Sequence, residues 1–171
     1  MVTSSFFEKL KEKNFKLKVV NKSNPWKFNY KNLNFSVCIR NISFAYRTNK
    51  DEYRVQVGKD SRTKLKDYHL NGFWGLIFGY HKKSDTFTTW DNKLLFNSRA
   101  LNRSLYTRES ICERASVNGL EYYTYVDNFF KEETVAITMQ NKYISHYLDQ
   151  IKTNNLHKFA NFKIFYRNFK N

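Results

Sequence analysis

Alternating apolar and polar positions predict short strands along most of the chain. The segment 53–57 (YRVQV) alternates strictly, so its apolar side chains share one face while Arg54 and Gln56 share the other. The run FWGLIFGY at 73–80 is almost continuously apolar, which is typical of a buried strand. Weaker alternation predicts further strands at 15–20, 33–39, 86–91, 104–107, 120–126 and 134–140.

Helical spacing of apolar positions occurs in a few places. A segment at 3–13 begins with a serine cap followed by Glu8, and a segment at 108–118 is stopped by Gly119. The segment 141–151 has one apolar stripe, and 61–68 is a weak short helix.

Polar or irregular segments separate these elements. Residues 40–52 and 92–103 are polar, basic connections, and 21–32 is an aromatic loop or irregular strand around Pro25. The tail 152–171 is basic and aromatic, and is either a docked helix or the start of a linker. From residue 33 the order predicts a barrel-like module of short, hairpin-connected strands.

Composition narrows the classes of protein. The chain has 171 residues, and 16 Phe, 12 Tyr and 3 Trp are enough for a core, which argues against global disorder. No apolar run approaches the length of a membrane span, and no signal peptide precedes the first charges, so we expect a cytoplasmic protein without membrane contact. Cys38 and Cys112 lack metal-ligand spacing and are expected to be half-buried thiols.

The net charge of +15 points to a polyanionic partner. Basic residues concentrate in 1–31, 40–66, 92–103 and 134–171, whereas 115–133 is acidic. A globule with basic segments and one acidic segment is typical of a nucleic-acid binder with a back face. An acidic membrane or protein surface, or solubility alone, are the competing explanations.

Three stretches resemble the B3-like DNA-recognition domains of restriction endonucleases. They are RTNKDEYRVQV (47–57), LIFGYHKKSDTFTTWD (76–91) and SLYTRESICERASVNGLEYY (104–123). The chain is similar in element order to the EcoRII-type amino-terminal domain and the LlaJI-type specificity subunit of McrBC-like systems, over residues 33–150. The resemblance implies a mainly β (α+β) fold, a B3-like seven-stranded open pseudobarrel with two flanking helices and an N-terminal extension. The expected domains are an N-terminal extension (1–32), a DNA-binding domain (33–151) and a basic tail or linker to a further domain (152–171).

This resemblance implies sequence-specific binding of double-stranded DNA through the major groove, with a nuclease subunit or domain as a further partner. Two arms would grip the groove, an N-arm at residues 40–52 and a C-arm at 92–103. The N-arm candidates are Arg40, Arg47, Thr48, Asn49, Lys50 and Asp51; the C-arm candidates are Asn97, Ser98, Arg99, Asn102 and Arg103. Their side chains are of the types that pair with base edges, whereas lysines contact phosphate. The expected phosphate contacts are Lys9, Lys11, Lys22, Lys27 and Lys93.

Catalytic signatures are missing from the sequence. There is no Glu-x-Lys strand motif, no paired nuclease histidines and no phosphate-binding glycine loop. We therefore expect a binding module with no catalytic residues, metal or cofactor, in which Glu52 pairs with a neighbouring arginine. Three alternatives stay open: a base-flipping SRA- or PUA-like reader of modified cytosine with its pocket around 26–30, a compact nuclease, and an RNA-binding protein.

Overall fold

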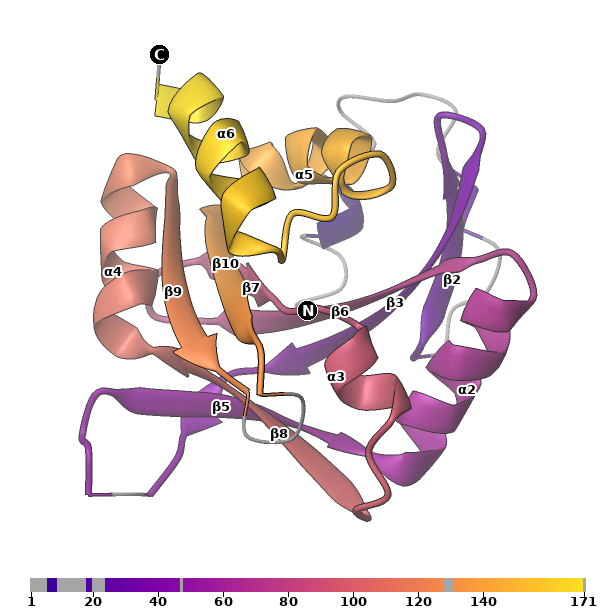
Figure 1. Cartoon of the computed structure of the whole chain (residues 1–171), viewed down its shortest axis with the longest axis horizontal. Coiled ribbons are helices and arrows are strands. Elements are labelled where there is room, and N and C mark those ends of the chain that lie inside the picture. The colour runs from indigo at the N-terminus through magenta and orange to yellow at the C-terminus, as the bar shows by residue number, and fades with distance from the viewer. Residues whose placement is uncertain (1–5, 9–17, 20–23, 47, 128–130, 171) are drawn as a thin grey trace.

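Two sheets of unequal size form the framework of the protein (Figure 1). The structure is a computed structural model that describes residues 6–8, 18–19, 24–46, 48–127 and 131–170. The strands are β1 (Lys18–Val19), β2 (Trp26–Tyr30), β3 (Leu33–Asn41), β4 (Ser43–Phe44), β5 (Glu52–Gly58), β6 (Trp74–His81), β7 (Thr86–Thr89), β8 (Asn102–Arg108), β9 (Leu120–Val126) and β10 (Glu133–Gln140). The helices are α2 (Lys59–Leu70), α3 (Lys93–Phe96), α4 (Glu109–Asn118), the 3-10 turn η1 (Asn141–Tyr143), α5 (Ile144–Ile151) and α6 (Phe159–Lys170).

The sheet topology gives an open pseudobarrel. The larger sheet has seven strands in the order β1-β2-β3-β6-β7-β10-β9, and the smaller has three in the order β4-β5-β8. The β3–β6 pair is parallel, whereas the other described pairs are antiparallel. The chain is thus mainly β with several helices, as the sequence predicts. Closure is incomplete because β8 and β9 are edge strands that do not pair with each other.

Two hydrophobic clusters fill the space on either side of the larger sheet. One lies against α5 and α6 and contains Phe78, Phe87 and Tyr147. The other lies between the two sheets and contains Trp90, only 1% exposed, whose Nε1 donates to the carbonyl of Tyr106 at 2.8 Å. The sheets approach closely at Gly79, where a Cβ atom would lie 2.7 Å from side-chain carbons of Ile42 and Val55. Only glycine fits there without displacing the second cluster.

Several predicted elements are confirmed. The strictly alternating segment 53–57 lies within β5, and 73–80 lies within the buried strand β6 apart from its first residue. Helix α4 ends at Gly119, whose φ of 88° is the left-handed conformation that glycine adopts readily. The segment 141–151 forms η1 and α5 with the predicted apolar stripe buried. The two thiols are fully buried rather than half-buried, and burial raises their pKa, that of Cys112 to about 11.

Two further expectations are refined by the structure. The segment 21–32, expected to be an aromatic loop or an irregular strand, contains the strand β2, because Phe28 and Tyr30 are buried in the core beside β3. The connection 92–103 is largely structured: α3 buries Leu94 and Leu95, and β8 begins at Asn102. Residues 6–8 are helical, as expected for the predicted helix at 3–13, and residues 18–19 are extended, as expected for the predicted strand at 15–20. The other residues of these two segments lie outside the described part of the chain.

Both flanks of the expected DNA-binding domain contribute to one core. Phe6 is 0% exposed and packs on Phe78 and Phe87, while Phe162 of α6 packs beside Tyr122. Residues 152–171 therefore contain a docked helix, not a bare linker, where the structure describes them. The domain boundaries themselves stay a prediction. Among the described helices, none has the length and apolar character needed to cross a membrane.

Candidate nucleic-acid interface

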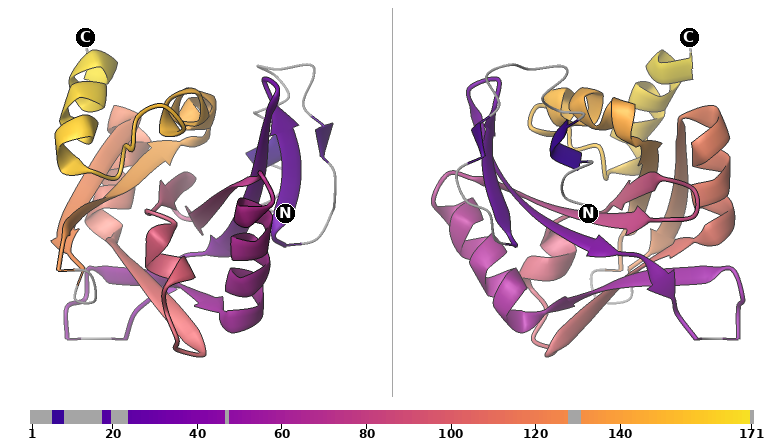
Figure 2. Two further views of the ribbon diagram at one scale, coloured as in Figure 1. Left: turned by 45° about the vertical axis from the view of Figure 1, so that its right-hand side comes forward. Right: turned by 180° about the vertical axis from the view of Figure 1, so that it is seen from behind.

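The smaller sheet presents one polar face, which we call the outer face. Residues alternate across a strand, so burial of Val55 and Val57 on β5 and of Leu105 and Thr107 on β8 turns the intervening residues outward. The outer face consists of Glu52, Arg54, Gln56, Asn102, Ser104, Tyr106 and Arg108, all partly or fully exposed. In Figure 2, β5 and β8 form the lower boundary of the described chain.

Antiparallel register places the outer-face side chains in opposed pairs. Glu52 lies opposite Arg108, Arg54 opposite Tyr106, and Gln56 opposite Ser104. Directly opposed side chains lie within contact distance across a ladder. The face therefore combines cations, amide and hydroxyl groups in a fixed arrangement, with an acid at one end.

One end of the outer face carries the hairpin tip between β4 and β5. Its Tyr46 is 85% exposed, and Thr48, Asn49 and Lys50 are exposed as well. The Asn49 side-chain oxygen accepts the N–H of Asp51 at 3.0 Å, and the Asn49 carbonyl accepts the N–H of Glu52. These local bonds hold the tip in one conformation.

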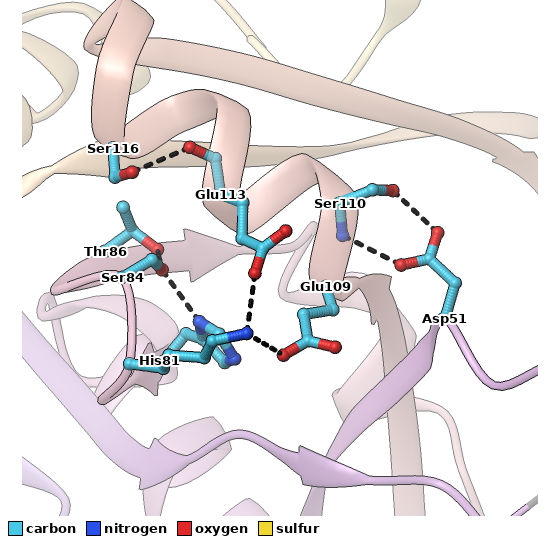
Figure 3. Close-up of polar contacts among 9 residues, drawn as sticks. Asp51, His81, Ser84, Thr86, Glu109, Ser110, Glu113 and Ser116 are labelled. Atoms are coloured by element: carbon cyan, nitrogen blue, oxygen red, sulfur yellow. Dashed lines mark hydrogen bonds and ion pairs between the residues drawn. The ribbon is translucent and has the colours of Figure 1, made fainter.

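Helix α4 anchors the base of this hairpin (Figure 3). The Asp51 carboxylate accepts the N–H of Ser110 at 2.8 Å and its hydroxyl at 2.6 Å, while the Asp51 carbonyl accepts the N–H of Glu109. A carboxylate is favourable at a helix N-terminus, where N–H groups lack partners within the helix. Asp51 thus fixes the N-arm to the protein body. Its partner Ser110 on α4 lies 59 residues further along the chain, so the residues near Asp51 in sequence do not reveal this role.

The N-arm is shorter than the sequence suggests. Arg40 lies outside it, within β3, and donates to the hydroxyl of Ser61 at 2.9 Å, so its DNA contact stays a prediction. The tip spans 45–51 instead of 40–52. Arg47 falls outside the described residues, so its predicted role stays a prediction.

The opposite end of the outer face carries the loop 97–101, which leads from α3 into β8. Asn97, Arg99 and Leu101 are exposed there, Leu101 by 77%. The buried guanidinium of Arg62 on α2 donates to the carbonyl oxygens of Ser98, Ala100 and Leu101. Burial also lowers the pKa of Arg62. The sequence pattern does not single out this arginine, because its only signal is a charged residue at an inward position of a weak helix.

Two predicted contact residues are engaged within the protein. Arg103 points to the inner side of β8 and donates to Asp127 at 2.6 Å, where the Asp127 side chain is 6% exposed. Lys93 on α3 donates to Glu132 at 2.5 Å and lies 3.8 Å from Asp91. Both cations are paired with acids from the acidic part of the sequence, which reduces their availability to an outside anion.

The remaining predicted phosphate contacts lie away from the arms or outside the description. Lys27 is on β2, with its ammonium 4.6 Å from the ring centre of Tyr68. Lys9, Lys11 and Lys22 are not among the described residues. In contrast, Lys50, Arg54 and Arg99 make no ion pair or side-chain hydrogen bond within the described part of the chain.

A groove separates the two unpaired edge strands, and we call its central cavity the seam pocket. Its volume is about 460 Å³, and its walls include Tyr106 of β8 and Tyr123 and Tyr125 of β9. The rings of Tyr123 and Tyr125 stack with centres 5.7 Å apart, and the Arg108 guanidinium lies 4.6 Å from the Tyr123 ring centre. Burial raises the pKa of Tyr125, so its hydroxyl keeps its proton at neutral pH.

A polar network joins the β6–β7 turn to α4, also shown in Figure 3. The Lys83 ammonium donates to Glu113 at 2.8 Å and to Glu109 at 3.2 Å, and His81 bonds to Ser84. Burial lowers the pKa of His81, which favours its neutral form. No group of three or more potential metal ligands exists among the described residues. This arrangement braces the helix that anchors the N-arm.

A second polar cavity of about 370 Å³ lies beside α5. Its buried His157 bonds to Val135 O at 2.7 Å and to the Tyr147 hydroxyl at 2.8 Å. Both ring nitrogens therefore have partners, and burial lowers the pKa of His157, so the ring is a satisfied core histidine.

We predict that Asp51→Ala destabilises the protein by about 1–2 kcal/mol, because the N-terminal N–H of α4 loses its acceptor. Urea denaturation would measure the free energy of unfolding. Asp67→Ala, at an exposed position of α2, is the matched control and should change it by less than about 0.5 kcal/mol. Equal stability of the two variants would show that the Asp51–Ser110 contact contributes nothing.

The described residues define an open, mainly β pseudobarrel with one polar sheet face between two anchored loops. The family model described as methylase-associated X1 matches residues 33–148, about two thirds of the chain. The chain therefore belongs to the methylase-associated X1 family, which is linked to restriction–modification systems. No curated protein and no solved structure matches it.

Proposed function

We propose that this protein binds double-stranded DNA sequence-specifically, as the target-recognition module of a restriction enzyme. The observation that carries the proposal is the outer face, a polar and cationic surface with an anchored, exposed loop at each end. The family's link to restriction–modification systems supports a role at DNA. The B3-like mode of binding, a partner nuclease of the McrBC-like or type II kind, and the absence of catalysis by this chain are parts of the same proposal.

The spacing of the two loops suits one stretch of duplex. The N-arm tip adjoins the Glu52–Arg108 pair, and the loop 97–101 adjoins the Gly58–Asn102 pair at the other end of the ladder. At about 3.4 Å per residue these pairs are roughly 20 Å apart. That distance is less than one turn of B-DNA, about 34 Å, so both loops can reach the same groove.

The distribution of paired and unpaired cations favours the same face. Arg54 lies in the middle of the outer face and Arg99 on the C-arm loop, with Lys50 on the N-arm tip; within the described chain none of them pairs with an acid. Arginine matches the O6 and N7 acceptors of guanine, whereas lysine interacts with phosphate as a point charge. We assign base contact to Arg99 and phosphate contact to Lys50.

Affinity for duplex DNA is predicted to fall steeply with salt. About four to eight phosphate contacts give a slope of roughly −4 to −7 in log K against log salt, because each contact releases a condensed counterion. Fluorescence anisotropy with a labelled duplex across a salt series measures this slope, and Lys50→Ala should reduce it by up to about one unit. A slope near zero would rule out binding to the DNA backbone.

A further inference from the structure

The seam pocket opens beside the surface that we propose to hold DNA. Four of its lining residues, Glu52, Asn102, Ser104 and Tyr106, also belong to the outer face. A duplex lying on that face would therefore pass over the mouth of the pocket. The volume of about 460 Å³ falls within the range of small-ligand sites, roughly 300–1,000 Å³.

The walls of the pocket suit a planar ring with polar edges. Tyr106, Tyr123 and Tyr125 supply aromatic surface, on which a nucleobase can stack. The side-chain oxygens of Asn102 and Ser104, two residues apart on the same face of β8, supply acceptors for an amino group. Cytosine, adenine and guanine carry an exocyclic amino group and match this set of groups, whereas thymine carries none.

The open seam leaves room that a closed barrel would lack. Arg103–Asp127 spans the seam near one end of β8 and Arg108–Tyr123 spans it near the other, at 2.6 Å and 4.6 Å respectively. These two contacts hold β8 and β9 apart at a fixed separation, with the cavity between them. A rigid, preformed site avoids the cost of ordering its walls when a ligand enters.

We propose that the seam pocket receives an amino-bearing base (cytosine, adenine or guanine) that has been turned out of the duplex bound on the outer face. This inference rests on the proposed function, and it relocates the base-flipping alternative from residues 26–30. That segment cannot form the pocket, because Phe28 is 0% and Tyr30 is 1% exposed. Turning out a base costs a few kcal/mol, and less when the base has no partner.

The test compares duplexes of one common sequence in which a single cytosine, adenine, guanine or thymine faces an abasic site. The unpaired base is already released, so wild-type protein should bind the duplexes with unpaired cytosine, adenine or guanine about tenfold or more tightly than the fully paired duplex. Unpaired thymine, which has no amino group, should give little gain. Anisotropy titrations at one salt concentration measure all five affinities.

Two variants connect the gain to the pocket. Tyr123→Ala and, as a milder change that removes the ring but keeps an apolar side chain, Tyr125→Leu lie outside the outer face. Each should reduce the gain to less than about threefold while keeping affinity for the paired duplex within about threefold. Thr124→Ala, on the same strand but outside the pocket lining, should behave as wild type. Circular dichroism verifies that each variant is folded.

The possible failures are distinguishable. Equal affinity for all duplexes, an equal gain for all four bases, or a gain that survives in both pocket variants would overturn the seam-pocket proposal and leave duplex binding intact. Loss of binding to every duplex by the wild-type protein would overturn the proposed function itself.

Discussion

The double variant Arg54→Ala/Arg99→Ala is expected to lose about 2–6 kcal/mol of binding free energy on its preferred duplex, at least a 30-fold fall in affinity. Each arginine that contacts DNA contributes roughly 1–3 kcal/mol, and distant positions contribute additively. Arg54 lies in the ladder of the smaller sheet, whereas Arg99 lies on the loop before β8. Arg99→Ala alone should also relax preference at one base pair, since a guanidinium matches one base edge.

A charge-matched control separates contact from net charge. Lys152 follows α5 and Arg167 lies in α6, and Figure 1 shows both helices far from β5 and β8. Lys152→Ala/Arg167→Ala removes the same charge and should weaken binding by less than about threefold. Anisotropy titrations of both double variants measure the difference. If the two lose affinity equally, the outer face has no special role.

Arg103→Ala is expected to lower the free energy of unfolding by about 2–4 kcal/mol. The substitution removes the cation beside Asp127, a residue that is 5% exposed, and a buried carboxylate without its cation is costly. The lower end of this range reflects the partial exposure of the Arg103 side chain, 26%. Urea denaturation measures the loss.

The matched control for this stability effect is Arg99→Ala, four residues earlier and exposed. It should change stability by less than about 0.5 kcal/mol. The double variant Arg103→Ala/Asp127→Ala completes a cycle whose coupling energy should be at least about 1 kcal/mol. A coupling near zero, or equal destabilisation by the two arginine substitutions, would contradict the claim that the Arg103–Asp127 pair holds the seam.

Patterns within single elements account for the correct part of the sequence prediction. Strict alternation at 53–57 identified β5, and the glycine after 118 identified the end of α4, because both signals depend on neighbouring residues alone. The segment at 26–30 carried no comparable signal. Its strand is stabilised by burial of Phe28 and Tyr30 against distant parts of the chain, which spacing does not encode.

For the same reason, the sequence does not distinguish candidate DNA-contact residues from residues that are engaged within the protein. Arg99 and Arg103 have similar local sequence, yet one is on an exposed loop and the other points inward at the start of β8. Their difference follows from the phase of the strand and from Asp127, 24 residues away. The seam pocket combines β8 and β9, which neither pair nor adjoin in sequence, so only the folded arrangement brings its tyrosines together.

Selection from a random library of duplex DNA at near-physiological salt tests the central claim most directly. The proposal of a sequence-specific recognition module predicts enrichment of one short consensus, and loss of preference for at least one of its base pairs in Arg99→Ala. Recovery of no consensus, or equal binding to single-stranded RNA of random sequence, would contradict it.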